Sequence, residues 1–196
     1  MSENTTEVIE KNAKILEDLF FSKLNAEKIE ALRQARAQSN ARETLRNVLP
    51  IGRSVNEDEL NMVLDDLLAV GITAETVTAL QLIPLVSVAW SDNDLSSEER
   101  GLLLNIAAEN EVTVSNLARE LLEQWLAEKP GPELLDSFKA FVAVYKLDAS
   151  PESVNHMRNI CLDKAEAIAA VSGGFLGFGA TNNEEQGMLQ ALKLLF

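Results

Sequence analysis

The residues best suited to chemistry are the carboxylates of one short turn between two predicted helices. Four acidic side chains fall within eight residues there: Asp92, Asp94, Glu98 and Glu99. Carboxylates that converge on one turn can bind a hard cation such as Ca²⁺ or Mg²⁺, which prefers oxygen ligands. An EF-hand does not fit, because its required Gly and Glu would fall on Ser97 and Leu103. Acidic residues also suit the positive end of a helix, so a capped and solvated turn is the alternative.

Other catalytic or ligating residue types are scarce. The chain has one cysteine, Cys161, and one histidine, His156. These counts exclude an intramolecular disulfide framework and disfavour His-based zinc sites and His-dependent catalytic triads. His156 precedes Cys161 by five positions on a predicted helix, which is poor geometry for a base that activates a thiol. We therefore expect Cys161 to be a small core residue.

A glycine-rich segment, residues 173–179, is the second unusual feature. A dinucleotide fingerprint needs a preceding strand, but the preceding segment is predicted to be helical. No Gly-Lys-Ser/Thr sequence supports a phosphate-binding loop. Two interpretations remain: an inter-helix loop whose Phe175, Leu176 and Phe178 fill the core, or an apolar loop that docks on a partner.

Charge and hydropathy narrow the class of partner. The chain of 196 residues carries 17 Lys and Arg against 31 Asp and Glu, a formal charge of −14, with a pI near 4.5. This balance argues against nucleic acid and anionic membrane surfaces, which attract basic proteins. No apolar run is long enough to span a bilayer, and the polar, acidic first twenty residues do not form a secretory signal. We expect a cytoplasmic protein without membrane insertion.

The apolar spacing predicts an all-α protein, a multi-helix bundle of eight or nine helices, because no sustained alternation typical of strands occurs. Residues 1–51 are predicted to form an N-terminal helical hairpin, with helices over 4–24 and 26–49. Asn25 would cap the second helix and Pro50 would end it. Residues 52–196 are predicted to form the bundle.

Start and stop signals position the acidic turn within this bundle. Ser54 with Glu57, or Asn56 with Glu59, predicts a capping box at a helix start. Gly71 fits the residue that follows this helix. A long apolar helix should then run from 73 to 90, kinked at Pro84, followed by the acidic turn and a helix capped by Ser96 with Glu99. Later helices are expected to start at Thr113 or Ser115 and to cover 133–147, 151–171 and 181–196.

A weak internal repeat accompanies these signals. Residues 97–103, SEERGLL, resemble residues 183–189, NEEQGML. In this alignment Asp92 and Asp94 fall opposite Phe178 and Ala180, so the acidic turn itself is not repeated. We interpret the similarity as a shared helix-start signal, which stabilises a helix by about 1 kcal/mol.

Residues 85–100, LVSVAWSDNDLSSEER, resemble the signature of TerB-like domains, the helical family named after tellurite resistance proteins. That pattern is an apolar helix ending in Ala-x-x-Asp-Gly, then an apolar residue, a capping residue and Glu. Asp92 and Glu99 match its acidic positions, whereas Asn93 stands in place of Gly. Asn tolerates a left-handed backbone better than most residues. The resemblance covers residues 73–110 and implies a cytoplasmic helical bundle, divalent-cation binding at this turn and association with stress or defence systems.

Together these features predict a non-enzymatic module that binds a divalent cation, Ca²⁺ or Mg²⁺ rather than Zn²⁺, at Asp92, Asp94, Glu98 and Glu99. The bound state would be passed to a protein partner. One alternative is an ion-free scaffold in which the turn only caps a helix. The other is a hydrolase with paired carboxylates, which would require a carboxyl of raised pKa in a cleft.

Overall fold

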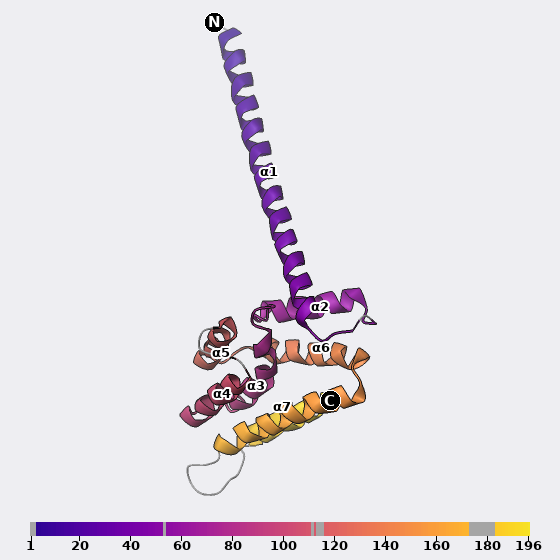
Figure 1. Cartoon of the computed structure of the whole chain (residues 1–196). Helices are drawn as coiled ribbons and strands as arrows, with labels where there is room; N and C mark the ends of the chain where they lie inside the picture. Colours follow the sequence, from indigo (N-terminus) through magenta and orange to yellow (C-terminus); the bar gives the residue numbers. More distant parts are fainter. Residues whose placement is uncertain (1–2, 53, 111, 113–115, 173–182) are drawn as a thin grey trace. The chain divides into compact units, whose positions relative to one another are not determined.

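The computed structural model describes residues 3–52, 54–110, 112, 116–172 and 183–196, with the backbone alone for 3–21 and 172. All regular elements in these ranges are helical, which confirms the all-α class and the predicted number of helices (Figure 1). The elements are α1 (Glu3–Val48), α2 (Glu57–Ala69), the 3₁₀ helix η1 (Val77–Leu82), α3 (Ile83–Ala89), α4 (Ser97–Glu109), α5 (Leu117–Ala127), α6 (Pro132–Asp148), α7 (Pro151–Ser172) and α8 (Asn183–Lys193). The glycine-rich residues 173–179 and the predicted helix starts Thr113 and Ser115 lie outside the described residues.

The predicted N-terminal hairpin was wrong. Residues 3–48 form one uninterrupted helix, α1, and the first compact unit is Met1–Ala41. No glycine or proline precedes Pro50, so nothing in this stretch prevents helical backbone geometry. Asn25 lowers helix stability by only a few tenths of a kcal/mol relative to Ala, which is too little to force a turn.

The second compact unit is Arg42–Phe196 and begins ten residues before the predicted boundary. It includes the last turns of α1, because Leu45 is buried in its hydrophobic core, as is Leu49 directly after the helix. Arg42 also forms a two-point ion pair with Asp65 of α2. As predicted, the helix ends just before Pro50, which cannot donate a backbone hydrogen bond.

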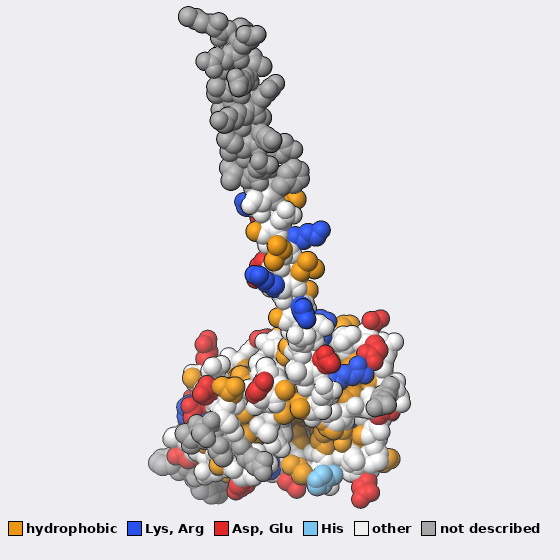
Figure 2. Space-filling model, turned by 45° about the horizontal axis from the view of Figure 1, so that its top comes forward, with side chains coloured by type: hydrophobic (Ala, Val, Ile, Leu, Met, Phe, Trp, Pro, Cys, Tyr) orange, Lys and Arg blue, Asp and Glu red, His pale blue; other side chains and the backbone are white. Residues whose placement is uncertain are grey.

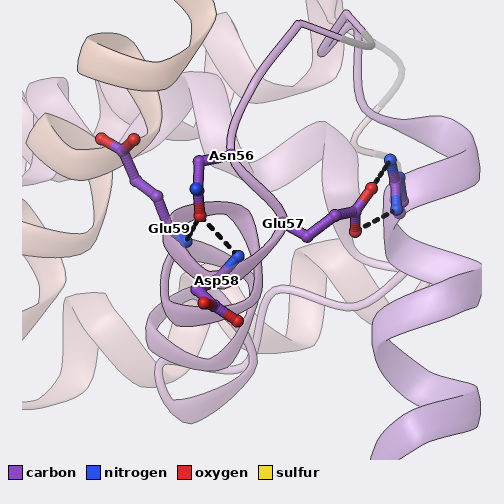
Figure 3. Close-up of polar contacts among 5 residues, drawn as sticks. Asn56, Glu57, Asp58 and Glu59 are labelled. Carbon is purple, nitrogen blue, oxygen red and sulfur yellow. Dashed lines mark hydrogen bonds and ion pairs between the residues drawn. The ribbon is translucent and has the colours of Figure 1, made fainter.

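Helix α2 begins with an acidic turn that faces solvent (Figure 3). The Oδ1 atom of Asn56 accepts hydrogen bonds from the backbone N–H groups of Asp58 at 2.9 Å and Glu59 at 3.3 Å. Glu57 makes a two-point ion pair with Arg46, with N–O distances of 2.8 and 2.9 Å. Asn56 is therefore the N-cap, and the carboxylate of Glu57 pairs with Arg46 instead of closing a box with Ser54.

The apolar segment predicted as one kinked helix over 73–90 is divided into η1 and α3. Pro84 lies in the first turn of α3, where its missing N–H costs nothing, and its ring is incompatible with a continuous helix through residue 80. Six of the seven residues of α3 are buried, which confirms that this segment lies at the centre of the bundle. Gly71 has φ +88°, and a Cβ there would lie 2.8 Å from a methyl carbon of Leu121.

The remaining helices enclose α3 and bring distant parts of the chain together. Helix α3 packs against α4, α6, α7 and α8, and α7 also packs against α4 and α8. Helix α2 packs against α6 on the other part of the bundle (Figure 1). In the described residues, no helix combines the length and hydropathy needed to cross a bilayer. The acidic turn thus lies where α3 ends, next to helices from the C-terminal third of the chain.

Candidate carboxylate centre

The acidic turn between α3 and α4 is held by contacts with the end of α5. The ring N–H of Trp90 donates to the carbonyl of Trp125 at 2.9 Å. Lys129 donates to the carbonyl of Trp90 at 2.7 Å and to Oδ1 of Asn93 at 2.6 Å. Asn93 has φ +69°, the left-handed conformation that the sequence pattern anticipated at this position. These contacts fix the path of the backbone on either side of Asp92.

Ser96 and Glu99 form the predicted capping box at the start of α4. The hydroxyl of Ser96 accepts from the backbone N–H of Glu99 at 3.1 Å. In return, Oε2 of Glu99 accepts from the backbone N–H of Ser96 at 2.9 Å and from its hydroxyl at 2.7 Å. The box fixes the position of the Glu99 carboxyl group and uses only one of its two oxygens.

The other oxygen of Glu99 is in an unusual environment for a carboxylate. Glu99 is only 2% exposed, and its Oε1 is buried without a hydrogen-bond partner among the described residues. Burial raises the pKa of Glu99, the hydrogen bonds from Ser96 oppose that rise, and the nearby charges of Glu185 and Asp92 add to it. The site therefore holds a carboxyl group that is stabilised through Oε2 by Ser96, while its Oε1 has no partner among the described residues.

Glu185 is the residue of this centre that the sequence analysis did not select. It lies in the first turn of α8 and is 1% exposed, and its charge acts on Glu99 although 86 positions separate them. The available signal was the repeat between residues 97–103 and 183–189, in which Glu185 aligns with Glu99. That repeat was interpreted as helix capping alone, but the fold brings its two glutamates into electrostatic contact.

The four predicted ligands have different environments. Asp92 is half-buried, and its Oδ1 accepts from the backbone N–H of Asp94 at 3.0 Å. Asp94 and Glu98 are exposed, and Glu98 accepts a hydrogen bond from Ser97 at 3.0 Å. Among the described residues, no three His, Cys, Asp or Glu side chains are arranged as a ready-made metal site. The acidic residues whose charges act on Glu99 are Glu185 and Asp92.

The single histidine and the single cysteine lie on α7. His156 is exposed, whereas Cys161 is buried, as the sequence analysis predicted. Burial raises the pKa of Cys161 to about 12, although the charge of Lys164 lowers it slightly. A thiol with this pKa is almost entirely protonated at neutral pH, which makes it a poor nucleophile.

No family model, curated protein or solved structure matches the chain. The resemblance to TerB-like domains accordingly stays a prediction based on the residues of the turn. In this turn Asn93 has a left-handed backbone, Ser96 caps α4 and Glu99 is buried. These features describe the geometry of the turn and do not identify what it binds.

Proposed function

We propose that the protein is a non-enzymatic helical module that binds a divalent cation at the centre formed by Asp92, Glu99 and Glu185. One observation supports this function above the others. Oε1 of Glu99 is buried without a hydrogen-bond partner in the part of the chain that the structure describes, and the charges of the acidic Glu185 and Asp92 act on this carboxyl group. A buried carboxylate normally has a hydrogen-bond donor or a positive partner, and a bound cation would supply that partner.

The donor set favours Ca²⁺ or Mg²⁺ over Zn²⁺. All three side chains offer oxygen atoms, which both hard cations prefer. Structural zinc sites mostly use cysteine and histidine, and this chain has one of each. Asp94 and Glu98 are exposed, so in this proposal they add to the negative field around the turn and are not direct ligands.

Cation binding at this position would couple two helix starts that are distant in the sequence. Glu99 belongs to the first turn of α4 and Glu185 to the first turn of α8. Repulsion between the two carboxylates weakens their association, and a shared cation would offset it. Because α8 packs on α3 and α7, the bound state would stabilise the C-terminal helix against the bundle. A protein partner that contacts α8 would then distinguish the two states, in a cytoplasmic stress or defence setting such as the resemblance implies.

An ion-free scaffold is the second candidate, and the capping box favours it. The box satisfies Oε2 of Glu99, and protonation of the raised-pKa carboxyl would satisfy the group without a cation. A carboxylate hydrolase has less support. Four clefts of about 300, 710, 310 and 370 Å³ on the described surface are lined by residues other than Asp92, Glu99 and Glu185.

Thermal unfolding separates the first two candidates. We expect millimolar Ca²⁺ or Mg²⁺ to raise the Tm of the wild-type protein, because a ligand that binds only the folded state stabilises it. Glu99→Gln and Glu185→Gln should lose this increase. Glu98→Gln is the matched control, since Glu98 is exposed on the same helix turn and should keep the increase. An unchanged wild-type Tm with both ions, or an increase that survives Glu99→Gln, would favour the scaffold.

A further inference from the structure

A cleft of about 710 Å³ lies between η1, α6 and α7, apart from the carboxylate centre. Its base is formed by buried apolar side chains, among them Leu80, Phe141 and Cys161. Phe141 stacks on Tyr145 with ring centroids 5.9 Å apart, so a pair of aromatic rings lines the cleft. Figure 2 shows hydrophobic side chains gathered in a hollow on the face that carries the histidine. Binding sites for small organic molecules have volumes and apolar linings of this kind.

The polar rim of the cleft contains one carboxylate, that of Glu152. Glu152 and His156 lie one turn apart on α7 and both line the opening, whereas no described Lys or Arg does. Residues 1–41 contain six Lys and Arg and seven Asp and Glu, so nearly all of the net charge of −14 belongs to the unit that contains the cleft. An anionic ligand would meet an unfavourable potential there, and a cationic group would be attracted to Glu152.

We propose that this cleft binds a small organic cation: an apolar, preferably aromatic, body that carries one protonated amine. The body would lie against Phe141 and Tyr145, and the ammonium group would face the carboxylate of Glu152 at the rim. The aromatic faces add a favourable contact for a positively charged ligand. This cleft is separate from the carboxylate centre, so the proposal for the cleft can be tested independently of metal-ion binding at that centre.

The experiment compares two probes that share one ring and differ in charge, 1-naphthylmethylamine and 1-naphthylacetate. Each is titrated into the full chain at pH 8, and the methionine methyl groups are followed by NMR. Met157 lines the cleft, whereas Met62 is 68% exposed on α2 and serves as an internal control. We expect saturable shifts of the Met157 methyl signal, with the amine binding at least about fivefold more tightly than the acetate.

Two variants test whether the preference for the amine over the acetate comes from Glu152 at the rim of the cleft. Glu152→Gln should bring the two affinities to within about twofold of each other, because it removes the charge and keeps the side-chain size. Asp163→Asn, an exposed substitution on the same helix outside the cleft, should preserve the preference. Equal or tighter binding of the acetate by the wild type would overturn the assignment. Non-saturating shifts with the amine, or shifts of Met62 as large as those of Met157, would do the same.

Discussion

The first turns of α2 and α4 share an acidic capping sequence, yet their electrostatics are opposite. At α2, Glu57 is exposed and paired with Arg46, whose hydrogen bonds lower its pKa (Figure 3). At α4, Glu99 is buried beside Asp92 and Glu185, and burial raises its pKa. Both turns satisfy free backbone N–H groups, but of the two only the α4 turn leaves a buried carboxylate oxygen without a partner among the described residues.

The difference arises from what covers each turn. A capping motif involves only residues that are close in the sequence. On that basis alone, the first turns of α2 and α4 look equivalent. The α4 start is covered by a bundle that also contains α8, and α8 adds a second buried glutamate. An acidic helix start becomes a candidate cation site when burial removes water from the carboxylate and no basic side chain takes the place of that water, because a buried charge needs a partner.

Removing the two caps should give the largest difference. Ser96→Ala deletes the hydroxyl that accepts from the N–H of Glu99 and donates to its carboxylate, so we expect a loss of about 1–2 kcal/mol. Asn56→Ala at the exposed start of α2 should cost about 1 kcal/mol or less. Urea unfolding of both variants measures the two values. A smaller loss of stability for Ser96→Ala than for Asn56→Ala would contradict the expectation that the buried cap of α4 contributes more to stability than the exposed cap of α2.

The pH dependence of stability should have opposite signs at the two turns. Glu99 has a raised pKa when folded, so the folded state retains a proton that the unfolded state releases above about pH 4.5. Its contribution is therefore fully present at lower pH and is lost as the pH rises through the folded pKa. Glu99→Gln keeps an acceptor for the capping box, and its stability relative to wild type should increase from pH 4.5 toward neutrality.

Glu57 provides the contrast for that measurement. Its pKa is lowered by Arg46, so its contribution is present above its ordinary pKa and is lost as the pH falls through the lowered value. The stability of Glu57→Gln relative to wild type should thus decrease from acidic pH toward neutrality. If both glutamine variants changed in the same direction with pH, the assigned environment of one of the two glutamates would be incorrect.

The smallest expected effect concerns salt. The Arg46–Glu57 pair is exposed, and salt screens exposed pairs efficiently. The stability difference between Glu57→Gln and wild type should shrink when NaCl is raised from 50 to 500 mM, as measured by urea unfolding. The effect of Glu99→Gln should change less, since its charge is shielded from solvent. Equal salt sensitivity at both positions would indicate that Glu99 is solvated.

Local patterns predicted much of the fold. Apolar spacing indicated the helices, Pro50 marked the end of α1, and Ser96 with Glu99 predicted the start of α4. The hairpin prediction was wrong because Asn25 was interpreted as a helix cap from its residue type alone. Asn destabilises a helix interior only slightly, and ending the helix there would need a stronger helix breaker such as Gly or Pro. Pro84 was recognised as a disruption, but its consequence, a change from 3₁₀ to α-helix, depends on packing around α3.

The candidate site was predictable only in part. Asp92 and Glu99 follow from their positions in the turn, and Asn93 has the backbone conformation expected for its place in the pattern. Glu185 could not be placed, because its proximity to Glu99 is set by the packing of α3, α7 and α8 and not by sequence spacing. Exposure separates Glu98 from Glu99, which are adjacent in the sequence but have opposite positions relative to the bundle.

Isothermal titration of Ca²⁺ and of Mg²⁺ into the metal-depleted wild-type chain, with Glu185→Gln beside it, tests the carboxylate centre most directly. We expect saturable binding of at least one of these ions, with one site per chain, and a marked loss of affinity in the variant, because one of the three acidic groups becomes neutral. Absence of binding heat at several temperatures, or equal affinity in the two proteins, would contradict a cation site built from α4 and α8.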